Sequence, residues 1–198
     1  MIKYALTLIA FFAAHNAFAA AQVGSAAPDF TATTASGKSV KLSDYKDKIV
    51  VLEWTNPGCP FVKKFYGAGA MQKLQAETKA KDVVWLSVNS GAEGNQGYVD
   101  AGSAKTLIAE QKAVPSEYLL DAKGEIGHLY AAKTTPHMFV VDKKGILAYA
   151  GAIDDKATPN PEDIAGANNY VVAAVDALVA GKTPETTSTQ SYGCSVKY

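Results

Sequence analysis

Short apolar runs alternate with longer amphipathic segments along most of this chain. The runs at 49–54 and 82–88 are mostly apolar or β-branched, which is typical of strands buried on both faces of a sheet. A shorter run at 118–121 predicts a third strand. The segments 137–142 and 146–151 flank a short turn that contains glycine, and this arrangement predicts a β-hairpin.

Helical patterns fill the intervals between these strands. The predicted helices cover 60–81, 104–112, about 125–131 and 168–180. Gly67 and Gly69 weaken the middle of the first helix, because glycine has a low helix propensity. Ahead of the helices, the segment 31–42 predicts two short strands around a turn. Alternating strands and helices that end in an antiparallel hairpin predict an α/β fold, with a mixed central β-sheet flanked by helices on both faces.

The composition is that of an ordinary globular protein. Hydrophobic residues make up 48% of the 198 residues, which is enough to bury a core, and a chain of this length fits one domain. The chain has 19 acidic and 19 basic side chains, without a long run of one sign. A nucleic-acid-binding protein would carry a basic patch or stripe, so we expect no nucleic-acid partner.

The N-terminus has the three parts of a secretory signal peptide. Lys3 supplies a positive start, an apolar run follows from Tyr4 to Ala14, and an Ala-x-Ala pattern ends at Ala19. The run is shorter than the roughly 20 residues that span a bilayer, which favours a cleaved signal peptide at 1–19 over an uncleaved anchor. We therefore expect an exported, periplasmic protein without a stable membrane anchor.

Two cysteines, Cys59 and Cys194, lie downstream of the predicted cleavage site. Cys59 follows a predicted buried strand and an Asn-Pro-Gly break, and Pro60 begins the next helix. A cysteine at a helix N-terminus has a lowered pKa, because unpaired N–H groups and the helix dipole favour the thiolate. Lys63 and Lys64 add positive charge nearby. We therefore predict Cys59 as the reactive nucleophile; the alternative is a buried, inert cysteine.

Cys194 lies in a segment, 182–198, that is rich in Thr and Ser and follows the predicted domain at 20–181. This composition predicts a mobile C-terminal tail. The thirteen residues from Gly181 to Cys194 reach at most roughly 45 Å, at about 3.5 Å per residue, which is enough to bring Cys194 onto Cys59. Cys194 could then resolve a sulfenic acid or a mixed disulfide on Cys59, form a structural bridge, or pair with another molecule.

Several motifs resemble those of known families. The stretch 51–62 resembles the active-site strand and helix start of thioredoxin-fold proteins, and Thr135-Pro136 resembles their cis-proline turn. The start at 24–30 (Gly-x-x-Ala-Pro-Asp-Phe) and the closing segment 193–198 resemble the alkyl hydroperoxide reductase/thiol-specific antioxidant branch, the redoxin or peroxiredoxin-like proteins. The resemblance covers essentially the whole mature chain.

This resemblance implies a thioredoxin-like fold in which the N-terminal β-hairpin is an extension. It also implies a thiol-dependent oxidoreductase or antioxidant activity, with a redox-active cysteine and no cofactor. The partners would be protein thiols or disulfides, or small peroxides, together with a reductant that the sequence does not identify.

The resemblance also implies roles for residues near Cys59. Glu53 matches the buried acid of thioredoxins, which acts as a general base for the second thiol; the alternative is a strand glutamate whose carboxylate reaches solvent. A cis Pro136 would keep strand pairing away from the sulfur and leave the backbone of Thr135 free to pair with an extended substrate. His137 fits a strand residue better than a catalytic one.

Two signatures of the resembled families are absent. Val62 stands where a dithiol oxidoreductase has the second cysteine of Cys-x-x-Cys. Leu52 and Asn56 stand at the proline and threonine positions of the peroxiredoxin pattern Pro-x-x-x-Thr-x-x-Cys. Thr55 or Asn56 would then have to supply the hydrogen bonds that hold a peroxide. The sequence leaves disulfide exchange and peroxide reduction both open.

Two other classes of function also stay open. The chain could be a binding module that has lost catalysis and uses its sheet as a docking platform. It could also handle copper, as some thioredoxin-fold chaperones do with Cys-x-x-x-Cys and a histidine. Lys63 takes the second cysteine position of that motif. Copper binding would therefore require Cys59, Cys194 and His137 to converge.

Overall fold

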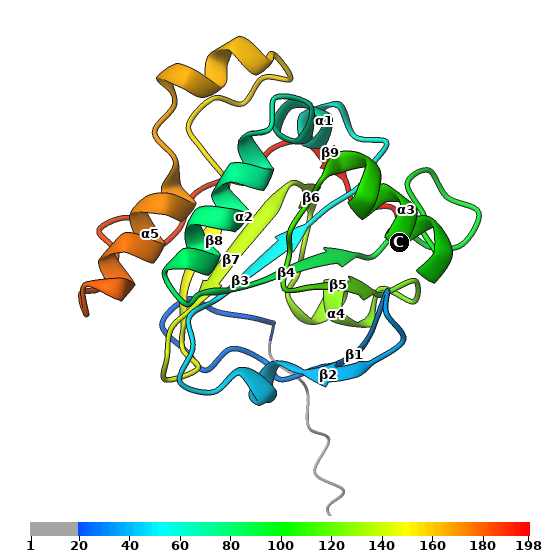
Figure 1. The fold of residues 1–198 in the computed structure, drawn as a ribbon. Helices are drawn as coiled ribbons and strands as arrows, with labels where there is room; N and C mark the ends of the chain where they lie inside the picture. The colour runs from blue at the N-terminus through cyan, green and yellow to red at the C-terminus, as the bar shows by residue number, and fades with distance from the viewer. Residues whose placement is uncertain (1–19) are drawn as a thin grey trace, which may run out of the picture.

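A seven-stranded mixed β-sheet forms the centre of the protein (Figure 1). The structure, a computed structural model, describes residues 20–198, so the predicted signal peptide at 1–19 lies outside the described residues. The strand order is β2-β1-β5-β4-β3-β7-β8. These strands are β1 Thr31–Thr34, β2 Ser39–Lys41, β3 Val50–Trp54, β4 Val84–Asn89, β5 Glu117–Leu120, β7 His137–Val141 and β8 Leu147–Gly151.

The strand directions confirm a mixed sheet. β3, β4 and β5 run parallel to one another, whereas β7 pairs antiparallel with β3 and forms an antiparallel hairpin with β8. The N-terminal hairpin of β1 and β2 joins the other side of the sheet through an antiparallel pair between β1 and β5. The predicted hairpin extension is therefore a continuation of the central sheet.

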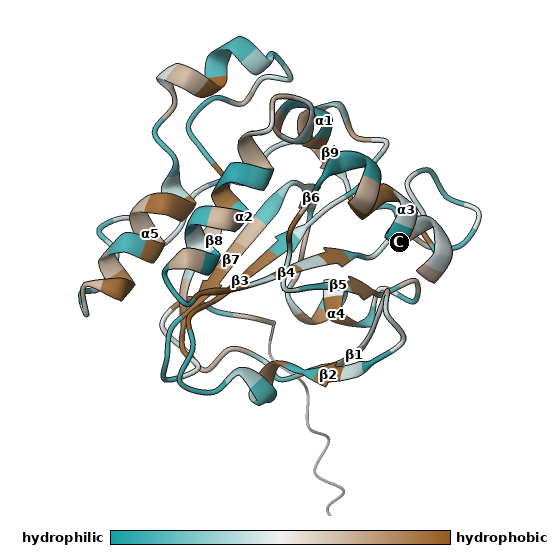
Figure 2. Ribbon diagram, viewed as in Figure 1, coloured by the Kyte–Doolittle hydropathy of each residue, from teal (hydrophilic) through white to brown (hydrophobic). Residues whose placement is uncertain are grey.

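Helices cover both faces of this sheet, as predicted. They are α1 Pro60–Gly67, α2 Ala70–Ala80, α3 Ala101–Gln111, α4 Glu125–Leu129 and α5 Tyr170–Val179, with 3₁₀ turns at Leu42–Tyr45 and Pro161–Gly166. Alternate residues of β3 enter opposite cores: Val51 packs with α1, α2 and α5, whereas Leu52 packs with α4 and the N-terminal segment. Figure 2 shows the resulting contrast between hydrophobic central strands and hydrophilic outer loops.

The predicted helix at 60–81 is two helices instead of one. Gly69 adopts a left-handed backbone with φ of +72°, which an α-helix cannot continue through, and it caps the start of α2. The break lets α1 and α2 follow the sheet independently. Cys59 therefore lies at the start of a short helix of its own.

The C-terminal tail lies against the domain and does not project from it. It forms a second, two-stranded sheet in which β9 (Cys194–Ser195) pairs antiparallel with β6 (Thr134–Thr135). At its end, Tyr198 stacks on His128 of α4, with 4.0 Å between ring centroids. Figure 1 shows the tail in red, passing close to α1 and β6 before the C-terminus. This is a docked position; the mobility predicted for the tail stays a prediction.

Among residues 20–198, no helix is long and apolar enough to cross a bilayer.

Candidate active site

Cys59 lies at the junction of β3 and α1, where the sequence predicts it. Its backbone caps the helix: the N–H donates to Asn56 O, the carbonyl accepts from Lys63 N, and Pro60 takes the first helical position. The side chain is fully buried. Its Sγ donates a hydrogen bond to Thr135 O at 3.1 Å, which joins the helix start to the turn before Pro136.

Hydrogen bonds lower the pKa of the Cys59 thiol. Burial alone raises it, but hydrogen bonds from the side chains of Cys194 and Thr135, and from the Val62 backbone N–H, outweigh that effect. The two nearby lysines are not among the causes of this lowered pKa. The ammonium of Lys64 is turned away to Lys156 O, at 3.0 Å. Cys59 thus owes its thiolate character to polar contacts with the tail and with the helix start.

The turn at Thr135-Pro136 faces Cys59, and its peptide bond is cis, as the resemblance implied. The backbone of Thr135 does not stay unpaired. It pairs with Cys194 in the two-stranded sheet, and the Thr135 hydroxyl donates to Cys194 O at 3.4 Å. Two residue pairs further on, Val196 N donates to Lys133 O at 3.0 Å. The tail thus occupies the position expected for an extended substrate.

Gly193 permits this close approach. Its φ is +123°, and a Cβ on this residue would lie 2.1 Å from Thr135 O. Any larger residue would collide with the backbone of β6, so a side chain here would push the tail away from the turn. The glycine directly before Cys194 is the one sequence signal that could have pointed to the pairing of β6 with β9.

Cys194 packs against the core cluster that contains Cys59, and the two thiols influence each other's pKa. Both cysteines are reduced, and Cys194 is partly exposed. Burial, followed by the hydrogen bond to Cys59 and its charge, raises the pKa of the Cys194 thiol to about 11. At neutral pH Cys59 is therefore the better thiolate of the pair, and Cys194 holds the proton.

Glu53 is a buried acid beneath this site. It lies on β3 with no exposed surface, which rules out the alternative of a carboxylate that reaches solvent. The carboxylate accepts hydrogen bonds from Trp85 Nε1 at 2.8 Å, Ser87 Oγ at 2.8 Å and Tyr66 OH at 2.9 Å. Burial nevertheless outweighs these donors and raises the pKa of Glu53.

Replacing Glu53 by glutamine should change how stability depends on pH. Because the folded pKa lies above the unfolded value of 4.5, Glu53 contributes stability that is complete below that pH and is lost as pH rises through the folded pKa. Urea unfolding of wild type and Glu53→Gln from about pH 4 to about pH 8 checks this. We expect the free energy of unfolding to fall less with rising pH in the variant; equal slopes would contradict the assignment.

The two residues proposed as peroxide donors, Thr55 and Asn56, are both buried. The Asn56 amide is engaged locally: its Nδ2 donates to Gln96 O at 3.1 Å, and its Oδ1 accepts from Gly58 N at 2.8 Å. Thr55 uses its backbone to bond Val88 O at 2.9 Å. Asn56 therefore shapes the loop before Cys59, and its role in holding a peroxide stays a prediction.

His137 is a strand residue at the start of β7. Burial, with a smaller effect of Lys133, lowers the pKa of His137 to about 4, so the imidazole is neutral at pH 7. Its Nδ1 accepts from Lys133 N at 3.3 Å. Within residues 20–198, no three His, Cys, Asp or Glu side chains converge as a metal site would require. The convergence that copper binding requires is not seen here.

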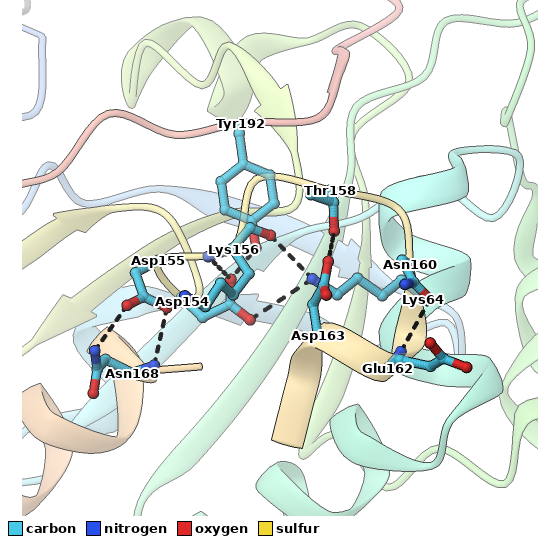
Figure 3. Close-up of polar contacts among 10 residues, drawn as sticks. All are labelled: Lys64, Asp154, Asp155, Lys156, Thr158, Asn160, Glu162, Asp163, Asn168 and Tyr192. Carbon is cyan, nitrogen blue, oxygen red and sulfur yellow. Dashed lines mark hydrogen bonds and ion pairs between the residues drawn. The ribbon is translucent and has the colours of Figure 1, made fainter. Parts of the chain in front are cut away.

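Sequence reasoning missed part of this site. Lys64 and Asp154 are both buried beside α1, yet they are 90 residues apart in the chain, and no motif links them. Tyr192 joins them from the tail, as Figure 3 shows. Of these three residues, only Tyr192 was open to prediction, as an aromatic residue close to Cys194 that could dock the tail.

Known proteins share this fold and this sequence pattern. The chain is 32% identical to the thioredoxin-like protein YneN of Bacillus subtilis (strain 168) over 127 residues, covering 64% of this chain and 69% of that protein. It is 28% identical to the thiol-disulfide oxidoreductase ResA of Geobacillus kaustophilus (strain HTA426) over 126 residues, covering 64% and 67%.

A solved structure extends the likeness to almost the whole chain. An uncharacterized conserved protein from Geobacillus kaustophilus superposes with a TM-score of 0.77 and 28% identity, covering 92% of this chain and 94% of that one. These relatives confirm the predicted thioredoxin-like fold and support an oxidoreductase. Residues 23–150 match the AhpC/TSA family. The chain therefore belongs to the AhpC/TSA family, in its thioredoxin-like branch.

Proposed function

We propose that this protein is an exported thiol–disulfide oxidoreductase in which Cys59 attacks and Cys194 resolves. The observation that carries the proposal is the pairing of Cys194 with Thr135, the residue whose carbonyl accepts the hydrogen bond from Cys59 Sγ. The chain lacks a local Cys-x-x-Cys partner, and the tail supplies one from 135 residues away in sequence.

The proposed cycle uses the two thiols of this protein and one disulfide of a client protein. The Cys59 thiolate attacks a client disulfide, forms a mixed disulfide, and releases one client sulfur as a thiolate. Cys194 then loses its proton and attacks the Cys59 sulfur. The Cys59–Cys194 disulfide forms, the bond to the client breaks, and the second client sulfur leaves as a thiolate. An external dithiol returns the protein to its reduced state.

Glu53 is the group that we assign to proton transfer in the second step. It would take the proton that Cys194 loses before attack, as the buried acid of thioredoxins does. Its raised pKa supports this role, because a carboxylate with a pKa nearer to neutrality is a better general base at neutral pH.

Disulfides fit this site better than peroxides as the oxidising substrate. The pairing of the cysteine-containing tail with Thr135 supports an extended peptide as the substrate, whereas the Asn56 amide is already engaged by Gly58 and Gln96. The N-terminal pattern adds an exported, oxidising compartment, in which disulfide clients occur.

A direct competition between oxidants tests this proposal. The reduced protein is mixed with oxidised glutathione or with hydrogen peroxide at equal concentration, and the loss of the Cys59 thiol is followed by mass spectrometry. We expect oxidation by the disulfide to be faster by about tenfold or more. Faster oxidation by peroxide, with sulfenic acid on Cys59 as the first product, would favour a peroxidase instead.

A further inference from the structure

A buried ion pair lies beside the active-site helix and is not explained by the chemistry at Cys59. The side chains of Lys64 and Asp154 are 0% and 2% exposed, with 4.0 Å between Nζ and Oδ2. Lys64 Nζ also donates to Lys156 O at 3.0 Å, and Lys156 N donates to Asp154 Oδ1 at 2.9 Å. Figure 3 shows this group between α1 and the loop that follows β8.

The tail completes this cluster with one side chain. The hydroxyl of Tyr192 donates a hydrogen bond to Asp154 Oδ1, as Figure 3 shows. The Tyr192 ring packs against Phe61, with 5.8 Å between centroids. Burial, followed by the bond to Asp154, raises the pKa of the Tyr192 hydroxyl, so the hydroxyl keeps its proton and stays a donor.

Tyr192 lies two residues before Cys194, so its contact with Asp154 bears on where Cys194 lies. Tyr192 and Cys194 flank Gly193, and both pack against the core cluster that contains Cys59. Both reach the same helix: Tyr192 contacts Phe61 in the first turn, and Cys194 contacts Cys59 at the N-terminus. Gly193 passes between them over Thr135 O. The tail is therefore fixed at two points on either side of the glycine.

We propose that Tyr192 is a positioning residue, held by Asp154 and Lys64, that fixes the register in which Cys194 meets Cys59. This inference rests on the proposed function, because positioning matters only if Cys194 resolves a mixed disulfide. Tyr192 touches no reacting atom. It raises the effective concentration of the Cys194 thiol at Cys59, and it holds the tail over Cys59 in the reduced protein.

Tyr192→Phe removes the hydroxyl and keeps the ring. The hydrogen bond that is lost has a charged acceptor, and such bonds stabilise by enough to change an equilibrium by about tenfold or more. Two results should therefore move in opposite directions. The effective concentration of the two thiols, from equilibrium with glutathione, should fall by about tenfold. The limiting rate of Cys59 alkylation by iodoacetamide at high pH, where the thiol is fully ionised in both proteins, should rise because the tail shields Cys59 less.

Tyr45→Phe is the matched control, because Tyr45 lies in the 3₁₀ turn before β3, away from the tail. It should leave both quantities at the wild-type values. Urea unfolding of the reduced proteins separates a positioning role from a general loss of stability. If Tyr192→Phe unfolds at the same urea concentration as the wild type, its changed resolution and alkylation cannot be attributed to a less stable fold.

The outcomes are distinguishable. If the wild type forms the Cys59–Cys194 disulfide and Tyr192→Phe forms it with an unchanged effective concentration, the positioning role is wrong and the proposed function stands. If the wild type forms no such disulfide with oxidised glutathione, the proposed function fails, and the positioning role fails with it.

Discussion

Cys59→Ser should abolish disulfide exchange, with a loss of about a thousandfold or more in rate. Only a thiolate attacks a disulfide sulfur at useful speed, and a serine hydroxyl stays protonated at neutral pH. Serine is close to cysteine in size, so the buried helix start should fold as before. The measurement is the rate of thiol release from a protein disulfide, for example insulin, in the presence of a reductant.

Val62→Ala is a suitable control for this variant, since it alters the neighbouring helix turn without removing a thiol. A Cys59→Ser protein that keeps wild-type exchange activity would disprove the assignment of Cys59. A variant that loses activity in vitro but replaces the wild type fully in the cell would favour the binding module over the enzyme.

Cys194→Ser should separate the two steps of the cycle. Attack by Cys59 does not require the second sulfur, so a mixed disulfide between Cys59 and the client should form and then accumulate. Multiple turnover should fall by about a hundredfold, because release of the client would depend on the external reductant alone. Non-reducing gel electrophoresis and mass spectrometry of the trapped species measure this effect.

Ser195→Ala, in the same tail strand, should accumulate no mixed disulfide beyond the wild-type level. Wild-type turnover by Cys194→Ser, without a trapped intermediate, would show that Cys194 is not the resolving thiol.

The strands and the position of Cys59 at a helix start could be predicted because their signals are local. The run around Val51 is apolar over its whole length, and the break before Cys59 is followed by a proline at the first helical position. The burial of Glu53 was harder to predict, because it depends on which side chains pack above that position of the strand. Here Trp85, Ser87 and Tyr66 supply donors that no sequence pattern announces.

The contacts of the tail could not be derived from the sequence. Pairing of Thr135 with Cys194 joins residues 59 positions apart through a strand of two residues, which is too short to show a period. The composition of the tail predicted mobility, because it is rich in Thr and Ser. The docked position includes a hydrogen bond from Tyr192 to Asp154, which lies beside the buried Lys64.

The lysines near Cys59 were expected to lower the pKa of its thiol, and the structure gives that lowering a different cause. Lys63 and Lys64 were expected to lower the pKa of the thiol, but Lys64 is engaged by Lys156 O and Asp154. The lowering comes from hydrogen bonds instead, and the largest of these comes from Cys194. Cys59 and Cys194 therefore lie in one cluster, which sequence spacing alone could not establish.

Peptide mapping of the oxidised protein tests the redox pair most directly. The reduced protein, residues 20–198, is treated with oxidised glutathione, digested without reductant, and examined by mass spectrometry. We predict a single intramolecular disulfide that joins the peptide containing Cys59 to the peptide containing Cys194, with the protein lighter by two hydrogen atoms. Glutathione carried separately on each cysteine, or a disulfide between two molecules, would contradict the pairing of Cys59 with Cys194.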